Sequence, residues 1–200
     1  MGAVPDPGLT GWCRRRCRPL LLPVARALHR LGVTPNGVSL LGLAGCAAAA
    51  AVLALGHPAA AALVLLFLGP LDAVDGILAR EFGGATRFGA FLDSTLDRYG
   101  EFCLFLGLLA YLWRRPGAGL PEAALVLAAL TGSLLVSYTR ARAEGLGFEC
   151  RVGLATRFER LLLFGAALLT GWILPLVGLI AVLAHATALQ RILHVRRLAR

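Results

Sequence analysis

Four aspartates lie within a 26-residue stretch of a segment that is otherwise strongly apolar. An acidic side chain at the centre of a bilayer costs about 2.5–3.5 kcal/mol on insertion scales, so four of them together indicate a functional site. With two glycines, an alanine and an arginine they form the pattern Asp72-x2-Asp75-Gly76-x2-Ala79-Arg80-x8-Gly89-x3-Asp93-x3-Asp97.

The spacing predicts that these residues form two stripes on two helices. Positions 72, 75, 76, 79 and 80 follow the i, i+3, i+4, i+7, i+8 rule for one helix face. Positions 89, 93 and 97 follow an i, i+4, i+8 rule on the next helix. Two antiparallel helices with these stripes facing each other would gather four carboxylates around one point: Asp72, Asp75, Asp93 and Asp97.

Four carboxylates surrounded by lipid need positive charge to neutralise them. Two divalent cations would balance them, and oxygen ligands favour Mg²⁺ or Mn²⁺. A two-metal cluster of this kind grips a diphosphate and stabilises charge during an in-line displacement at phosphorus. The sequence therefore predicts a metal-dependent phosphotransfer site with two Mg²⁺ ions, with Mn²⁺ as the other possible metal.

The remaining residues of the pattern suit a phosphorylated ligand. Gly76 and Ala79 lack bulk, so a ligand could approach the backbone of the first helix closely, and Gly89 would do the same on the second. The planar fork of Arg80 suits a phosphate oxygen. Small residues also serve helix packing, and buried acids also occur in ion and proton transporters. The combination of the acids with a phosphate-suited arginine favours phosphotransfer.

The composition tells which elements must position these residues. The chain is 58% hydrophobic and 16% charged, whereas a soluble domain carries about 25% charged residues. Several apolar stretches approach the roughly 20 residues that span a bilayer, which disfavours the alternative of a soluble helical protein. We predict an all-α integral membrane protein whose six transmembrane helices cover residues 38–56, 60–81, 88–113, 121–143, 157–174 and 176–195.

Residues 12–31 mix arginines with leucines, which predicts an N-terminal interfacial helix, broken by Pro19 and Pro23. We expect one domain over residues 1–200, with an interfacial segment at 1–33 and a six-helix core at 34–195. If both termini are inside, only Arg114 and Arg115 lie on the outer side. This predicts a multi-pass cell-membrane protein with a cytoplasmic active site. The net charge is +9, and we expect its basic residues to contact membrane lipids and not nucleic acid.

The eight-residue pattern resembles the complete signature of the CDP-alcohol phosphatidyltransferases, with every position matched. The resemblance implies a six-helix membrane enzyme, a homodimer, in which an acceptor hydroxyl attacks the lipid-side phosphorus of CDP-diacylglycerol and CMP leaves. It implies that the four aspartates hold the metal and that Asp97 is also the general base. By the same resemblance, the CDP moiety would be bound by Asn36, Asp72, Gly76, Ala79, Arg80, Thr86 and Gly89.

Two segments resemble the subgroup of this family that makes phosphatidylinositol phosphate. They are GAFLDSTLDR at residues 89–98 and SYTRARAE at residues 137–144. The resemblance implies inositol 1-phosphate as the acceptor, a phosphorylated polyol whose phosphate needs two or three arginines. Five arginines are predicted to converge on that phosphate at the cytoplasmic mouth: Arg140, Arg142, Arg157, Arg160 and Arg191.

Two other functions remain open at this point. A phosphatidylglycerophosphate synthase would use glycerol 3-phosphate, whose phosphate would suit the same arginines. Such enzymes commonly carry lysine after the fourth aspartate, where this chain has Arg98, which counts mildly against that acceptor. A non-catalytic membrane transporter with buried acids is the alternative from another class.

Overall fold

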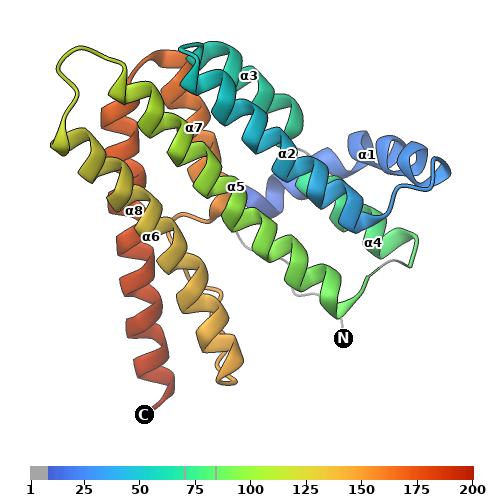
Figure 1. Ribbon diagram of the computed structural model, residues 1–200. Coiled ribbons are helices and arrows are strands. Elements are labelled where there is room, and N and C mark those ends of the chain that lie inside the picture. Colours follow the sequence, from blue (N-terminus) through green and yellow to red (C-terminus); the bar gives the residue numbers. More distant parts are fainter. Residues whose placement is uncertain (1–8, 70, 84) are drawn as a thin grey trace.

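The computed structural model describes residues 9–69, 71–83 and 85–200, and within these ranges the chain forms helices and no strand (Figure 1). The helices are α1 (Leu9–Arg30), α2 (Pro35–Ala54), α3 (Pro58–Leu68), α4 (Leu71–Glu81), α5 (Arg87–Trp113), α6 (Leu120–Gly145), α7 (Arg157–Thr170) and α8 (Ile173–Leu198).

Among the described residues, four segments are long and apolar enough to cross a membrane. They are α2, the stretch Pro58–Glu81 that contains α3 and α4, α6 and α8. The α5 helix is outside this set because its first half is rich in charged residues, and α7 because it has 14 residues. Large apolar side chains face outward, such as Phe67 and Val182, which are 76% and 66% exposed. The chain is therefore an all-helical membrane protein, as its composition predicts.

The predicted bounds of α2, α5, α6 and α8 are correct to within three residues at each end. The predicted span over 60–81 lies within the apolar stretch Pro58–Glu81, in which α3 ends at Leu68 and α4 begins at Leu71. The predicted span over 157–174 is too long at its end: α7 ends at Thr170 and is followed by Gly171, whose φ of 75° gives a left-handed cap.

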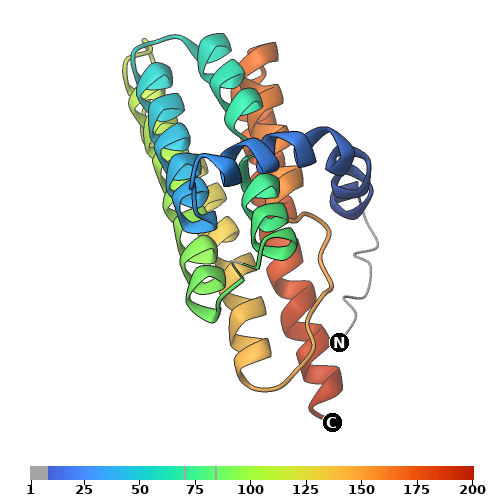
Figure 2. The same cartoon turned by 90° about the vertical axis from the view of Figure 1, so that its right-hand side faces the viewer.

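The prediction that Pro19 and Pro23 break the N-terminal helix is wrong as well. Both prolines lie inside α1, which continues through them and bends along its length (Figure 2). The α1 helix packs against α4, where the rings of His29 and Phe82 stack with centroids 4.2 Å apart. Arg18 of α1 forms an ion pair with Glu81 at the end of α4. These contacts place α1 beside the helix that carries the first two aspartates.

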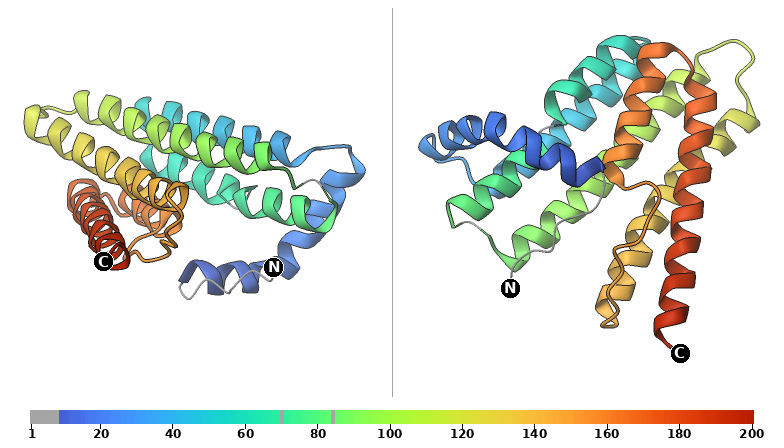
Figure 3. Two further views of the ribbon diagram at one scale, coloured as in Figure 1. Left: turned by 90° about the horizontal axis from the view of Figure 1, so that it is seen from below. Right: turned by 180° about the vertical axis from the view of Figure 1, so that it is seen from behind.

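The most extensive helix pairs are α2 with α5 and α6 with α8, which lie side by side (Figure 3). In the first pair the two backbones come unusually close. A Cβ atom on Gly107 would lie 2.5 Å from the carbonyl oxygen of Ala50 and 2.7 Å from its Cα. Only glycine fits at this position of α5, so Gly107 sets how near α5 can lie to α2.

We predict that Gly107→Ala destabilises the protein by about 1–3 kcal/mol, because the added methyl group forces the two backbones apart. Size-exclusion chromatography after heating of the detergent-solubilised protein measures this as a lower melting temperature. Gly165→Ala is the matched control, since a Cβ on Gly165 of α7 meets nothing within 4 Å. Equal melting temperatures for the two variants would contradict the close approach.

Candidate active site

The helices α2 and α5 begin with the same short motif. Thr34 caps α2, and its hydroxyl oxygen accepts a hydrogen bond from the Gly37 N–H at 3.1 Å. Thr86 caps α5, and its hydroxyl oxygen accepts from the Gly89 N–H at 2.9 Å. Each threonine satisfies one of the N–H groups that a helix start leaves without a partner.

These two helix starts lie side by side. A Cβ atom on Gly89 would stand 3.0 Å from Oδ1 of Asn36 and 3.0 Å from Oγ1 of Thr86. The structure thus brings together three residues that the family resemblance assigns to CDP binding. Helix N-termini carry partial positive charge and bind phosphate groups readily, so their pairing suits an anionic ligand.

The α4 helix carries the other predicted CDP-binding residues. A Cβ atom on Gly76 would lie 3.3 Å from both terminal nitrogens of Arg80, so this side chain folds back over the glycine. Arg80 is exposed and Ala79 is half-buried on the same helix face. The predicted stripe of small residues beside a guanidinium is therefore present.

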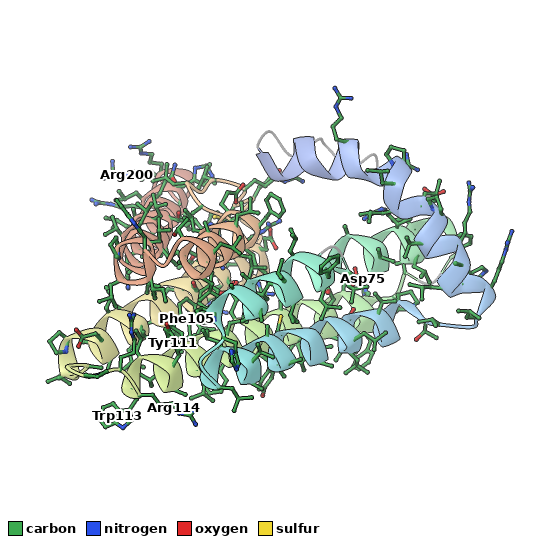
Figure 4. All side chains as sticks on the ribbon, turned by 90° about the horizontal axis from the view of Figure 1, so that it is seen from above. Asp75, Phe105, Tyr111, Trp113, Arg114 and Arg200 are labelled. Atoms are coloured by element: carbon green, nitrogen blue, oxygen red, sulfur yellow. The ribbon has the colours of Figure 1, made fainter. Side chains whose placement is uncertain are left out.

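Asp75 is the most enclosed of the aspartates whose side chains the structure describes, with 5% of its surface exposed, and it lies among the helices (Figure 4). The Ser39 hydroxyl of α2 donates to Oδ2 of Asp75 at 2.7 Å. Sequence reasoning did not assign Ser39 to the site. Its position three residues after Asn36, on the same face of α2, is the signal that could have found it.

The predicted metal ligands are distributed over α4 and α5. Asp93 and Asp97 are half-buried on α5, and the side chain of Asp72 lies outside the described part of the structure. Among the described side chains, no three acidic, histidine or cysteine residues gather closely enough to form a metal-binding group. The donors at these positions are carboxylate oxygens, a set whose chemistry fits a hard divalent cation and not a thiolate-seeking one.

The acidic face of α5 continues one turn beyond the predicted ligands, to Glu101. This carboxylate is 5% exposed and pairs through Oε1 with Arg160 of α7 at 2.7 Å. Sequence reasoning missed Glu101, although it extends the i, i+4 series of Asp93 and Asp97 by one step. A buried carboxylate requires a cation or hydrogen-bond donors, and α7 supplies the cation.

The first residue of α7 connects this pair to the predicted base. Nη1 of Arg157 lies 2.8 Å from Oδ1 of Asp97, and its Nε lies 3.7 Å from Oε1 of Glu101. Arg98 is also near, with its Nη1 3.9 Å from Oδ2 of Asp97. Two of the five predicted phosphate-binding arginines, Arg157 and Arg160, are thus held at the acidic face of α5.

The other three predicted arginines have different surroundings. Arg140 is exposed and pairs with Glu144 on its own helix at 2.8 Å, and Arg142 is also exposed. Arg191 of α8 is 4% exposed and donates to the backbone carbonyls of Val136 and Val152. These contacts join α8 to α6 at Val136 and to the 146–156 loop at Val152, and the charges of Arg140 and Arg160 are close enough to act on Arg191.

Known proteins resemble the chain over most of its length. The sequence model of the family described as CDP-alcohol phosphatidyltransferase matches residues 32–190. The phosphatidylinositol phosphate synthase of Cutibacterium acnes is 36% identical over 94% of this chain and 95% of its own length.

Two solved structures of the Mycobacterium tuberculosis phosphatidylinositol phosphate synthase share the fold at 34% identity. The one with CDP-DAG bound has a TM-score of 0.81 over 88% of this chain and 94% of that chain. The one in complex with manganese and citrate has a TM-score of 0.80 over 88% of each. The chain belongs to the CDP-alcohol phosphatidyltransferase family.

Proposed function

We propose that this protein transfers a phosphatidyl group from CDP-diacylglycerol to inositol 1-phosphate and releases CMP, as a phosphatidylinositol phosphate synthase. The observation that carries the proposal is the Arg157 guanidinium 2.8 Å from Asp97. This guanidinium, which would bind the phosphate of the acceptor, lies beside the aspartate that would act as base. The 36% identical synthase of Cutibacterium acnes supports inositol phosphate as the acceptor.

In this reaction an acceptor hydroxyl attacks the phosphorus that carries the diacylglycerol. The bond from that phosphorus to the CMP oxygen breaks, and the hydroxyl proton passes to a carboxylate oxygen of Asp97. The paired helix starts with Asn36 and Thr86 would hold the nucleotide and diphosphate, and Arg80 a phosphate oxygen. Arg157 and Arg160 would bind the phosphate of the acceptor, and Arg140, Arg142 and Arg191 remain predicted contributors.

The four aspartates of α4 and α5 would hold the metal. The manganese-bound relative supports a divalent cation, and we propose two ions, Mg²⁺ or Mn²⁺, at Asp72, Asp75, Asp93 and Asp97. When bound, they supply positive charge beside the diphosphate. The Ser39 hydroxyl would fix the orientation of the Asp75 carboxylate for this role.

We also propose the membrane arrangement that this chemistry needs. The six spans would be α2, α3 with α4, α5, α6, α7 and α8, with residues 1–33 at the interface of a single domain. The arginine distribution supports a cytoplasmic active site in the cell membrane. The α1 helix beside α4 supports an interfacial position near the site. The homodimer stays a proposal that the family resemblance suggests.

The first test is CMP release by the purified protein with CDP-diacylglycerol and Mg²⁺, with one acceptor at a time. Inositol 1-phosphate, glycerol 3-phosphate, free inositol and serine are the four acceptors. We expect release with inositol 1-phosphate alone: the arginines favour the two phosphorylated acceptors, and the similarity to a phosphatidylinositol phosphate synthase favours inositol phosphate over glycerol phosphate. Release with glycerol 3-phosphate alone would reject the acceptor, and release with free inositol would reject the role of the arginines.

Asp97→Asn is expected to lower the rate of CMP release at least about 100-fold, because an amide cannot accept the hydroxyl proton. Glu149→Gln, which removes the same charge from an exposed side chain, is the control and should leave the rate unchanged. Both variants should elute as the wild type does in size-exclusion chromatography. A near-normal rate for Asp97→Asn would exclude Asp97 as the base.

Ser39→Ala is expected to weaken Mn²⁺ binding about tenfold, because outer-shell hydrogen bonds to metal ligands typically contribute 10–100-fold in affinity. The free Mn²⁺ signal in electron paramagnetic resonance measures the dissociation constant. Ser94→Ala is the matched control, since the hydroxyl of Ser94 donates to the Phe91 carbonyl of its own helix. The same affinity in both variants would remove Ser39 from the metal site.

A further inference from the structure

The guanidinium of Arg157 lies between two carboxylates that are one turn apart on α5. It is 2.8 Å from Asp97, at its Nη1, and 3.7 Å from Glu101, at its Nε. The side chains of Arg157 and Asp97 are each 21% exposed, whereas that of Glu101 is 6% exposed. One arginine therefore bridges an accessible carboxylate and a buried one.

The carboxylate of Glu101 is held in place by its partners on α7. Oε1 of Glu101 pairs with Nη2 of Arg160 at 2.7 Å, and Nη1 of Arg160 donates to the Ala155 carbonyl at 3.3 Å. Arg160 is 3% exposed and lies one turn after Arg157 on α7. Glu101 can therefore hold two guanidiniums of α7 at α5 without moving itself.

At the Asp97–Glu101 end of the acidic face, arginines already surround the carboxylates. Arg98, Arg157 and Arg160 supply three positive charges near the two carboxylates Asp97 and Glu101. A divalent cation on Asp97 would compete with Arg157 for the same carboxylate and repel its guanidinium. Glu101 is the nearby acceptor that could keep Arg157 when it leaves Asp97.

We propose that Glu101 is a positioning residue that draws Arg157 away from Asp97 when a divalent cation binds there. Glu101 touches no substrate; it acts through Arg157. It keeps this guanidinium next to the metal, where the phosphate of the acceptor would meet it. The inference rests on the proposed function for the roles of Asp97 and Arg157. It adds Glu101 as the residue that lets Asp97 bind the metal while Arg157 stays close by.

The test is Mn²⁺ binding to the detergent-solubilised protein without substrates, measured by electron paramagnetic resonance. Arg157→Gln should tighten Mn²⁺ binding about threefold, because it removes a partly exposed ion pair that competes for Asp97. Glu101→Gln should weaken it about threefold, because a neutral amide draws Arg157 away from Asp97 less strongly than a carboxylate does. The double variant should bind as tightly as Arg157→Gln, since Glu101 acts only through that arginine.

A simple charge effect gives another pattern. If Glu101 and Arg157 influenced the metal only by their charges, the two changes would cancel and the double variant would match the wild type. Arg98→Gln is the control, since it removes the same charge next to Asp97 from an arginine that forms no ion pair with Glu101 among the described contacts. In a double variant, the changes in Mn²⁺ binding free energy caused by Arg98→Gln and Glu101→Gln should add. Cancellation in the Glu101–Arg157 double variant would overturn the proposal.

Glu101→Gln leaves Arg160 buried without a carboxylate and could prevent folding. If Glu101→Gln does not fold, Glu101→Asp decides the proposal, because it keeps a carboxylate for Arg160 but shortens the side chain that lies 3.7 Å from Arg157. Its Mn²⁺ affinity should fall below that of the wild type although the charge is unchanged, and an affinity equal to or above that of the wild type would overturn the proposal. Failure of inositol 1-phosphate as an acceptor would reject the proposed function and leave the order of Mn²⁺ affinities intact.

Discussion

The close contact between α2 and α5 determines where the rest of the site lies. Gly107 allows the backbone of α5 to touch that of α2 at Ala50, and the two helices then run together to their N-termini. There, a Cβ atom on Gly89 would lie 3.0 Å from the side chains of both Asn36 and Thr86, so the glycine lets Asn36 of α2 reach the start of α5. Gly107 and Gly89 therefore allow α5 to lie close to α2 along most of its length, so the N-termini of the two helices are next to each other.

A second constraint is the burial of charge between α5 and α7. A carboxylate and a guanidinium that are each almost fully buried stabilise the fold only when they are paired, because an isolated charge in this setting is strongly unfavourable. Glu101 and Arg160 meet this requirement at 2.7 Å. The pair thereby sets the position of α7, and with it the position of Arg157 at Asp97. Arg160, which forms the buried pair with Glu101, and Arg157, which forms an ion pair with Asp97, lie one turn apart on α7.

Much of this could be predicted from the sequence, because it depends on periodicity. The helix ranges and the placement of the aspartates on α4 and α5 follow from the spacing of apolar and acidic residues. The missed features depend on contacts between distant segments or on the local backbone. Ser39 matters because Asp75 lies opposite it, and the left-handed cap at Gly171 ends α7 earlier than hydropathy suggests. The α1 helix continues through Pro19 and Pro23 although proline usually breaks a helix, which is the rule behind the wrong prediction.

The length of α7 has a consequence for the depth of the site. Its 14 residues extend about 21 Å at 1.5 Å per residue, against a hydrocarbon thickness of about 30 Å. The loop before α7 would therefore enter the apolar layer, where an irregular backbone needs protein partners for its polar groups. Thr187 accepts from the N–H groups of Leu154 and Ala155, and Arg191 donates to the Val152 carbonyl. Because α8 supplies hydrogen-bond partners for the backbone of this loop, the loop can line a polar path through the apolar layer. A water-soluble acceptor could follow this path to Asp97 without contact with the lipid chains.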